Sequence, residues 1–172
     1  ENLQVGIGAS NQIQGKQLSY NNINDTDAAL ELVNEFPQND GAAAVIVKHA
    51  NPCGVGVANS LVEAYRSAFS CDKTSAFGGI VALNRIIDEE SAREISKVFT
   101  EVVIAPDITE GARKIFSSKS NLRLLITKKS PVQACSSKVI KHIAGGYLLQ
   151  DKDIGPFSQN NLRVVTKELR QK

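Results

Sequence analysis

Short apolar runs alternate with amphipathic segments along residues 25–126 of the chain. The runs have the length and β-branched content of buried strands, and they lie at 43–47, 77–84, 102–105 and 122–126. Between them, apolar residues recur at the three- and four-residue spacing of helices that bury one face. This alternation is typical of βαβ units, so we predict an α/β fold with a mainly parallel or mixed sheet and helices on both faces.

Each expected helix has a polar residue that can cap its first turn. The capping residues are Asp25 or Thr26, then Ser60, Asp88 and Thr109. The first helix is expected to bury Ala28, Ala29, Leu32, Val33 and Phe36, and the helix after Asp88 to bury Ala92, Ile95, Val98 and Phe99.

The remaining segments suggest how the chain is divided. Residues 1–24 predict an extended lead-in, and residues 25–150 a single subdomain. Within it, residues 139–150 predict a strand with a glycine bend at a sheet edge. Residues 151–172 predict a polar tail or a linker.

The composition of the 172 residues is that of a soluble globular protein, with 42% hydrophobic and 22% charged residues. No apolar run approaches the roughly 20 residues of a membrane span, and no leader sequence is evident, so we expect a cytoplasmic location and no membrane partner. The odd number of widely spaced cysteines predicts reduced thiols: Cys53, Cys71 and Cys135. The sequence begins at Glu1 and has no methionine, which we interpret as a piece of a longer protein.

The net charge of +2 hides a basic C-terminal third. Residues 113–172 contain 13 of the 20 lysines and arginines and 3 of the 18 acidic residues. Such a region can meet a polyanion, face solvent or contact another part of the same protein. Because no aromatic residues alternate with the basic ones, we expect no nucleic-acid partner.

The most reactive side chains follow the apolar run 43–47. Lys48 and His49 come directly after it, and we expect Asn51, Pro52 and Gly54 to form a turn there. In open α/β sheets the carboxyl ends of the strands form the ligand-binding edge. There a neutral imidazole can accept a proton and an ammonium can stabilise an oxyanion, but both reach one ligand only if the strand has already broken at Lys48. The alternative is that the pair merely ends the strand and faces water.

Neither zinc nor a phosphate loop is expected. A zinc deaminase needs His-x-Glu followed by Pro-Cys-x-x-Cys. The segment that begins at His49 lacks the Glu, and the segment that begins at Pro52 lacks the second Cys. The glycines at 54, 56, 78 and 79 fall short of the dinucleotide and triphosphate motifs.

Five segments resemble successive blocks of the AICAR transformylase family, which in bifunctional purine-biosynthesis enzymes is joined to IMP cyclohydrolase. They are 14–23 (QGKQLSYNNI), 46–54 (IVKHANPCG), 75–84 (SAFGGIVALN), 101–106 (EVVIAP) and 121–125 (NLRLL). The resemblance runs from about residue 12 to the end of the chain. It implies a cytidine-deaminase-like, three-layer α/β/α subdomain that binds no zinc.

The resemblance also implies an activity and site residues. The family transfers a formyl group from the co-substrate 10-formyltetrahydrofolate to the 5-amino group of the AICAR nucleotide. At the matching positions, His49 is expected to be the general base and Lys48 to stabilise charge on the formyl oxygen. Gly78 and Glu101 match positions that contact the nucleotide, as Lys48 and His49 also do.

The sequence departs from the family in what it lacks. It contains no Arg-Tyr-Gly segment to hold the phosphate, no cyclohydrolase domain and no second transformylase subdomain. We therefore expect these two domains and a second copy of the parent chain as partners, and an inactive isolated fragment. The alternative is a non-catalytic deaminase-like module that binds a nucleotide or forms a dimer, with a zinc hydrolase as a third reading.

Overall fold

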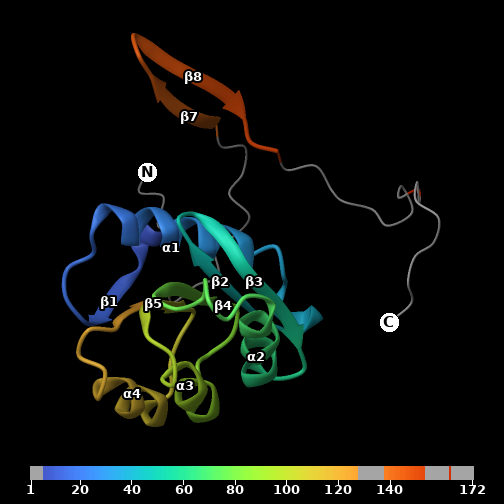
Figure 1. Cartoon of the computed structure of the whole chain (residues 1–172), viewed down its shortest axis with the longest axis vertical. Helices are drawn as coiled ribbons and strands as arrows, with labels where there is room; N and C mark the ends of the chain where they lie inside the picture. The colour runs from blue at the N-terminus through green and yellow to red at the C-terminus, as the bar shows by residue number, and fades with distance from the viewer. Residues whose placement is uncertain (1–5, 128–137, 154–162, 164–172) are drawn as a thin grey trace. The chain divides into compact units, whose positions relative to one another are not determined.

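One six-stranded sheet forms the centre of the first of two compact units, Glu1–Gln133 and Ala134–Lys172. The computed structural model describes residues 6–127, 138–153 and 163 (Figure 1). In spatial order the strands are β1 (Asn11–Gln14), β6 (Arg123–Ile126), β5 (Thr100–Ala105), β4 (Gly79–Leu83), β2 (Ala42–Lys48) and β3 (Asn51–Ala58). Strands β4, β5 and β6 run parallel, whereas β2 is antiparallel to β3 and β4, and β1 to β6. The sheet is mixed, as predicted.

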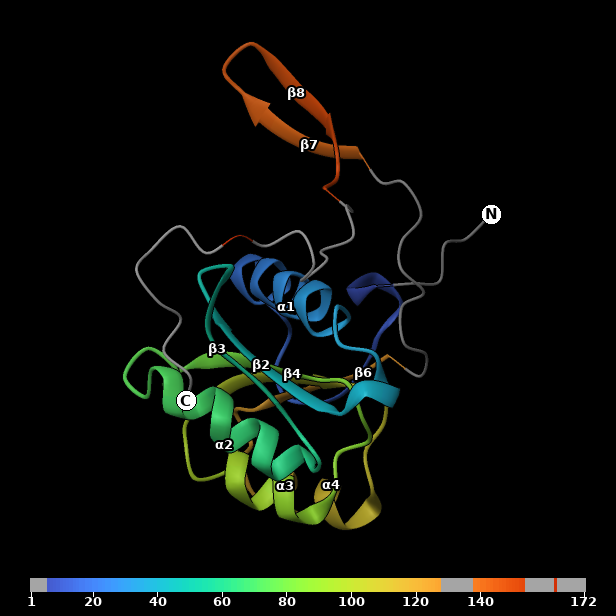
Figure 2. The same cartoon turned by 90° about the vertical axis from the view of Figure 1, so that its right-hand side faces the viewer.

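Helices cover both faces of this sheet, which confirms the three-layer α/β/α class. Helix α1 (Tyr20–Val33) lies on one face, and α2 (Leu61–Cys71), α3 (Glu89–Ile95) and α4 (Glu110–Ser117) lie on the other (Figures 1 and 2). Two short 3-10 helices, η1 (Ile7–Ala9) and η2 (Gln38–Asp40), complete the unit. Within the described ranges, no helix is long and apolar enough to cross a membrane.

Strand β2 joins the two halves of the core. Its even-numbered residues from Ala42 to Ile46 pack toward α2, and its odd-numbered residues from Ala43 to Val47 pack toward α1. All six are at most 1% exposed. Because burying a valine or isoleucine side chain contributes about 1.5–3 kcal/mol, this strand anchors both layers.

The predicted turn at residues 51–54 is wrong, because these residues begin strand β3. Pro52 is tolerated there since β3 lies at the edge of the sheet and pairs with β2 alone. Gly54 and Gly56 instead allow α2 to approach. A Cβ atom at these positions would lie 2.0 Å from the Ala68 carbonyl oxygen and 2.2 Å from that of Ala64, respectively.

Helix α1 begins earlier than predicted. Ser19 caps it, since its hydroxyl accepts a hydrogen bond from the Asn22 N–H while the Asn22 side chain accepts one from the Ser19 N–H. Asp25 and Thr26 therefore lie inside the helix, and the expected lead-in contains β1 and the first turn of α1. The domain boundaries themselves stay a prediction.

The other caps are confirmed at Ser60, Asp88 and Thr109. Helix α3 ends at Ile95, however, so Val98 and Phe99 do not belong to its buried stripe. Phe99 lies in the segment before β5 and is 46% exposed.

The second unit contains an antiparallel hairpin of β7 (Lys138–Ile143) and β8 (Gly146–Asp151). The predicted extended segments and the glycine bend between them are confirmed, but the two strands form a sheet of their own instead of an edge of the six-stranded sheet. Directly opposed residues share a face, so Ile140 and Leu149 lie on one face and Val139 and Leu148 on the other. All four are exposed. Most of the predicted tail at 151–172 lies outside the described residues.

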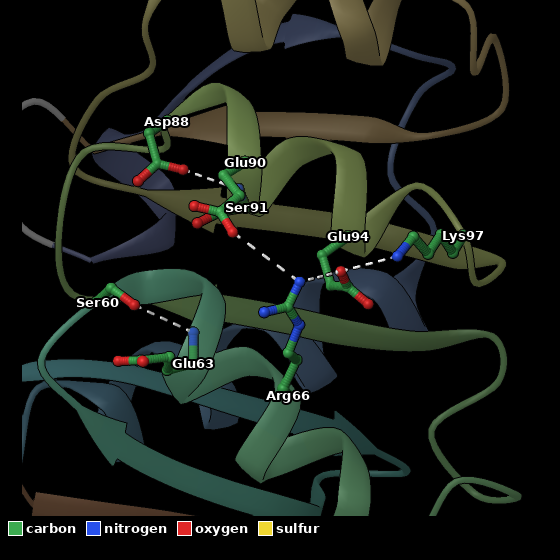
Figure 3. Close-up of polar contacts among 8 residues, drawn as sticks. All are labelled: Ser60, Glu63, Arg66, Asp88, Glu90, Ser91, Glu94 and Lys97. Carbon is green, nitrogen blue, oxygen red and sulfur yellow. Dashed lines mark hydrogen bonds and ion pairs between the residues drawn. The ribbon is translucent and has the colours of Figure 1, made fainter.

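An ion-pair network joins α2 to α3 (Figure 3). The Arg66 guanidinium donates to Glu94 Oε2 at 2.7 Å, and Lys97 Nζ donates to the same oxygen at 2.9 Å. These hydrogen bonds, that from Arg66 first, hold the pKa of Glu94 below its ordinary value. Glu90 lies at 4.0 Å from Arg66 and is more exposed than Glu94.

We expect Glu94→Gln to lower the free energy of unfolding by about 0.5–1 kcal/mol at pH 7. A carboxylate with a lowered folded-state pKa stabilises the fold above its unfolded-state pKa, and that contribution is lost as the pH falls through the folded-state pKa. The difference from the wild type should therefore vanish in acid. Urea unfolding from pH 7 to pH 3.5 measures it, with Glu90→Gln as the control that changes little. An equal difference at both ends of this range would contradict the prediction.

Candidate functional site

The residues singled out by sequence lie along one edge of the sheet. Strand β2 ends at Lys48, β4 follows Gly78, and Glu101 is the second residue of β5. The pairs Val47↔Ile80 and Gly79↔Thr100 set these ends side by side on three adjacent strands. Because β2 is antiparallel to β4, its carboxyl end meets the amino ends of β4 and β5. Lys48 and His49 lie at the carboxyl end of β2, as predicted, but the parallel strands β4 and β5 present their amino ends at this edge.

Lys48 and His49 face the same pocket. The pocket has a volume of about 440 Å³ and is lined by Lys48, His49, Asn51, Pro52, Cys53, Asp72 and Ser75. Lys48 is the last residue of β2, and the chain leaves the strand at His49, so the two neighbours both line this pocket. A β-bulge lies next to the turn. Ile46 pairs with Gly54 and Val47 with Pro52, so Cys53 is the extra residue of β3.

The backbone at His49 has an unusual conformation. His49 and Ala50 form the two-residue turn between β2 and β3, with φ values of 54° and 56°. The Asp25 carboxylate accepts hydrogen bonds from both of their N–H groups, at 3.0 and 2.9 Å. The Asn51 side chain donates to the His49 carbonyl at 2.7 Å. Sequence reasoning missed Asp25 in this role.

Lys48 reaches toward the loop that precedes β4. Its Nζ donates to the carbonyl of Phe77 at 3.0 Å. Asp72 orders the same loop, because its carboxylate accepts hydrogen bonds from the Ser75 hydroxyl and from the Ser75 and Thr74 N–H groups. These bonds, chiefly the one from the Ser75 hydroxyl, lower the pKa of Asp72, so the pocket wall holds a carboxylate at neutral pH.

Gly78 connects this loop to β5. Its φ of 73° is a left-handed conformation that favours glycine, and its N–H donates to the Phe99 carbonyl at 2.8 Å. The rings of Phe77 and Phe99 lie 5.4 Å apart, and both side chains are exposed. The helical spacing of apolar residues after Asp88 predicts Phe99 to be buried in the helix, and so gives no sign of its contacts with Gly78 and Phe77.

Glu101 is held from two other elements. Asn22, in the first turn of α1, donates to Glu101 Oε2 at 2.7 Å, and the Arg123 guanidinium of β6 lies 3.9 Å from the same oxygen. Asn22 is 4% exposed although it is polar, which is a signal of a structured contact. The carboxylate is half-buried, and a carboxylate so placed can accept hydrogen bonds from ligand hydroxyl groups.

Comparison with known proteins identifies the family. The family model for the AICARFT/IMPCHase bienzyme matches residues 1–172. This chain belongs to the AICARFT/IMPCHase bienzyme family. Among curated relatives, the bifunctional purine biosynthesis protein PurH is 56% identical in Roseobacter denitrificans, 58% in Jannaschia sp. and 57% in Brucella ovis, each over 94% of this chain. The chain covers 31%, 30% and 30% of those proteins, respectively, which is about a third of their length.

A weaker likeness is found among solved structures. RibD of Acinetobacter baumannii matches 56% of this chain and 33% of its own, with a TM-score of 0.44 and 12% sequence identity.

Metal-binding side chains are not clustered in the described part of this AICARFT/IMPCHase family member. Among residues 6–127, 138–153 and 163, no group of three or more His, Cys, Asp or Glu could hold an ion. Burial raises the pKa of the Cys53 thiol, the Asp72 charge raises it further, and Lys48 opposes them. Cys53 is thus a protonated, half-buried thiol in the pocket wall, whereas Cys71 is exposed. Cys135 lies outside the described residues.

We expect iodoacetamide to modify Cys71 faster than Cys53 at pH 8. The thiolate is the reactive form, and the raised pKa of Cys53 lowers the fraction of this thiol that is deprotonated. Partial burial also limits the access of the reagent to Cys53, whereas Cys71 is exposed. The Cys53 rate should continue to rise as the pH passes 9. Peptide mass spectrometry over time measures both rates, with the guanidinium-unfolded chain as the control in which they converge. Equal rates in the folded chain at pH 8 would refute this account of the pocket wall.

Proposed function

We propose that this chain supplies the general base and an oxyanion-stabilising cation for formyl transfer to AICAR from 10-formyltetrahydrofolate. The observation that carries the proposal is that Lys48 and His49 line one pocket, on the edge that also bears Gly78 and Glu101. The family and the purine-biosynthesis names of the relatives support it.

The reaction needs positioning and charge stabilisation more than a strong acid. The amine of AICAR is conjugated to a ring that bears a carboxamide, so it is a weak nucleophile. Its nitrogen forms a bond to the formyl carbon, and His49 accepts the amine proton. The Lys48 ammonium stabilises the oxyanion of the tetrahedral intermediate. The bond from the formyl carbon to N10 of the folate then breaks, and N10 receives the proton from His49.

The present contacts of Lys48 are compatible with this role. One of its three N–H donors is used by the Phe77 carbonyl, which leaves donors for a developing oxyanion. That contact also holds the ammonium of a residue that lines the pocket. A group held in place beforehand stabilises a transition state without reorganisation at the moment of reaction.

Gly78 and Glu101 are proposed to contact the nucleotide. The Gly78 N–H is already bonded to Phe99, so a nucleotide would meet its carbonyl or its Cα, beside the Phe99 ring. Glu101 would accept hydrogen bonds from ribose hydroxyls while Asn22 and Arg123 hold its carboxylate.

The rest of the longer protein is proposed to complete the site. We propose the second transformylase subdomain, the cyclohydrolase domain and a second copy of the parent chain as partners, and no activity for the isolated chain. The exposed apolar residues on both faces of the β7–β8 hairpin support such contacts, since large apolar side chains gather at interaction surfaces. A cytoplasmic location and the absence of nucleic-acid and membrane partners stay predictions.

We expect His49→Ala in the full-length protein to lower the rate of formyl transfer by about 10²–10⁴-fold. AICAR binding and IMP cyclohydrolase activity should be retained, because the substitution removes the proton acceptor and leaves the folded structure intact. Ala50→Gly is the matched control in the same turn, and it should keep the rate. The isolated 172-residue chain, assayed in parallel, should show no turnover.

The alternative of a non-catalytic module makes the opposite prediction. An unchanged formyl-transfer rate in His49→Ala, in protein that still binds AICAR, would reject the proposed base. Turnover by the isolated chain near that of the full-length protein would reject its proposed dependence on the missing domains.

A further inference from the structure

The turn that carries His49 is strained. A two-residue turn of this hand needs positive φ at both central positions, and Asn-Gly is the preferred sequence. This chain has His49 and Ala50 there, at 54° and 56°. A side chain with a Cβ atom is disfavoured in this conformation, so some other interaction must hold the turn.

The Asp25 carboxylate supplies that interaction. Oδ2 accepts from the His49 N–H at 3.0 Å and Oδ1 from the Ala50 N–H at 2.9 Å, so one carboxylate bridges both central amides. In a two-residue hairpin turn these N–H groups make no strand-to-strand bonds. Hydrogen bonds to a charged acceptor are also stronger than neutral ones.

Asp25 is itself held firmly in place. It lies in α1, and its neighbour Thr26 and the residue Ala29 one turn later are both 0% exposed. Ala29 belongs to the core cluster that contains Val45 and Val47 of β2. The carboxylate therefore fixes the turn relative to the helix layer and not only to the hairpin.

We propose that Asp25 is a positioning residue for His49, which holds the left-handed turn so that the imidazole faces the pocket beside Lys48. Asp25 accepts hydrogen bonds from the His49 and Ala50 N–H groups and a longer one, at 3.5 Å, from the Asn24 side chain. Its contact with His49 is therefore made through the backbone. This inference rests on the proposed function of His49 as the base.

The first test is independent of activity. In the ¹H–¹⁵N spectrum of the 172-residue chain, Asp25→Ala should shift the His49 and Ala50 amide protons upfield and speed their exchange with solvent. Asp25→Asn, which keeps one acceptor oxygen, should give a smaller change. Asp40→Asn is the matched control for loss of one exposed carboxylate, and it should leave both amides unchanged. Unchanged amides in Asp25→Ala would overturn the proposal.

The second test uses the full-length protein. Asp25→Ala should lower kcat for formyl transfer by about 10- to 100-fold, with KM for AICAR changed less than about 2-fold, because a misplaced base affects the reaction more than binding. Adding Ala50→Gly to Asp25→Ala should recover part of kcat, since glycine adopts positive φ without the hydrogen bonds to the Asp25 carboxylate.

The outcomes separate the two claims. An unchanged kcat in Asp25→Ala, or a loss that Ala50→Gly does not recover in protein with an unchanged Tm, would overturn the positioning role. If His49→Ala leaves kcat unchanged, the proposed function is wrong. The positioning role is then wrong as well, even if the amide spectra confirm the hydrogen bonds from the His49 and Ala50 N–H groups to Asp25.

Discussion

The direction of strand β2 determines where the site lies. This strand is buried on both faces, packs against both helix layers and pairs with β3 and β4, each in antiparallel orientation. Its carboxyl end therefore meets the amino ends of β4 and β5. Had β2 run parallel to β4, Lys48 and His49 would lie at the opposite edge from Gly78 and Glu101.

Polar contacts from both helix layers then shape this edge. Helix α1 contributes Asn22 to Glu101 and Asp25 to the His49 turn. On the other face, the segment after α2 contributes Asp72, which orders the loop that carries Phe77. Asn22 and Asp25 act on a strand residue and a turn from the helix layer, whereas Asp72 acts on the loop before β4, so helix residues as well as loop residues position the site.

Much of the fold could be predicted because short apolar runs and helix-capping residues are local features of the sequence. The buried runs located β2, β4, β5 and β6, and Ser60, Asp88 and Thr109 located three helix starts. Strand direction could not be predicted, since periodicity is the same for parallel and antiparallel strands. Ser19, Asp25 and Thr26 are all residue types that can cap the first helix. The hydrogen bonds of the capping box between Ser19 and Asn22, which only the structure shows, identify Ser19 as the cap.

The candidate site was less accessible from sequence. His49 and Ala50 are not typical turn formers, so the residue types favour a turn at Asn51, Pro52 and Gly54 instead. The contact of Asp25 with this turn spans 24 residues and leaves no local signal. Glu101 and Gly78 were singled out by resemblance alone, and their shared edge with Lys48 emerged from strand pairing.

The central claim is that this edge holds the AICAR nucleotide. Hydrogen–deuterium exchange of the full-length protein, measured by mass spectrometry with and without AICAR, tests it most directly. The account predicts protection on binding in segments 48–53, 75–79 and 99–101. Protection elsewhere in the protein, with these three segments unchanged, would contradict it.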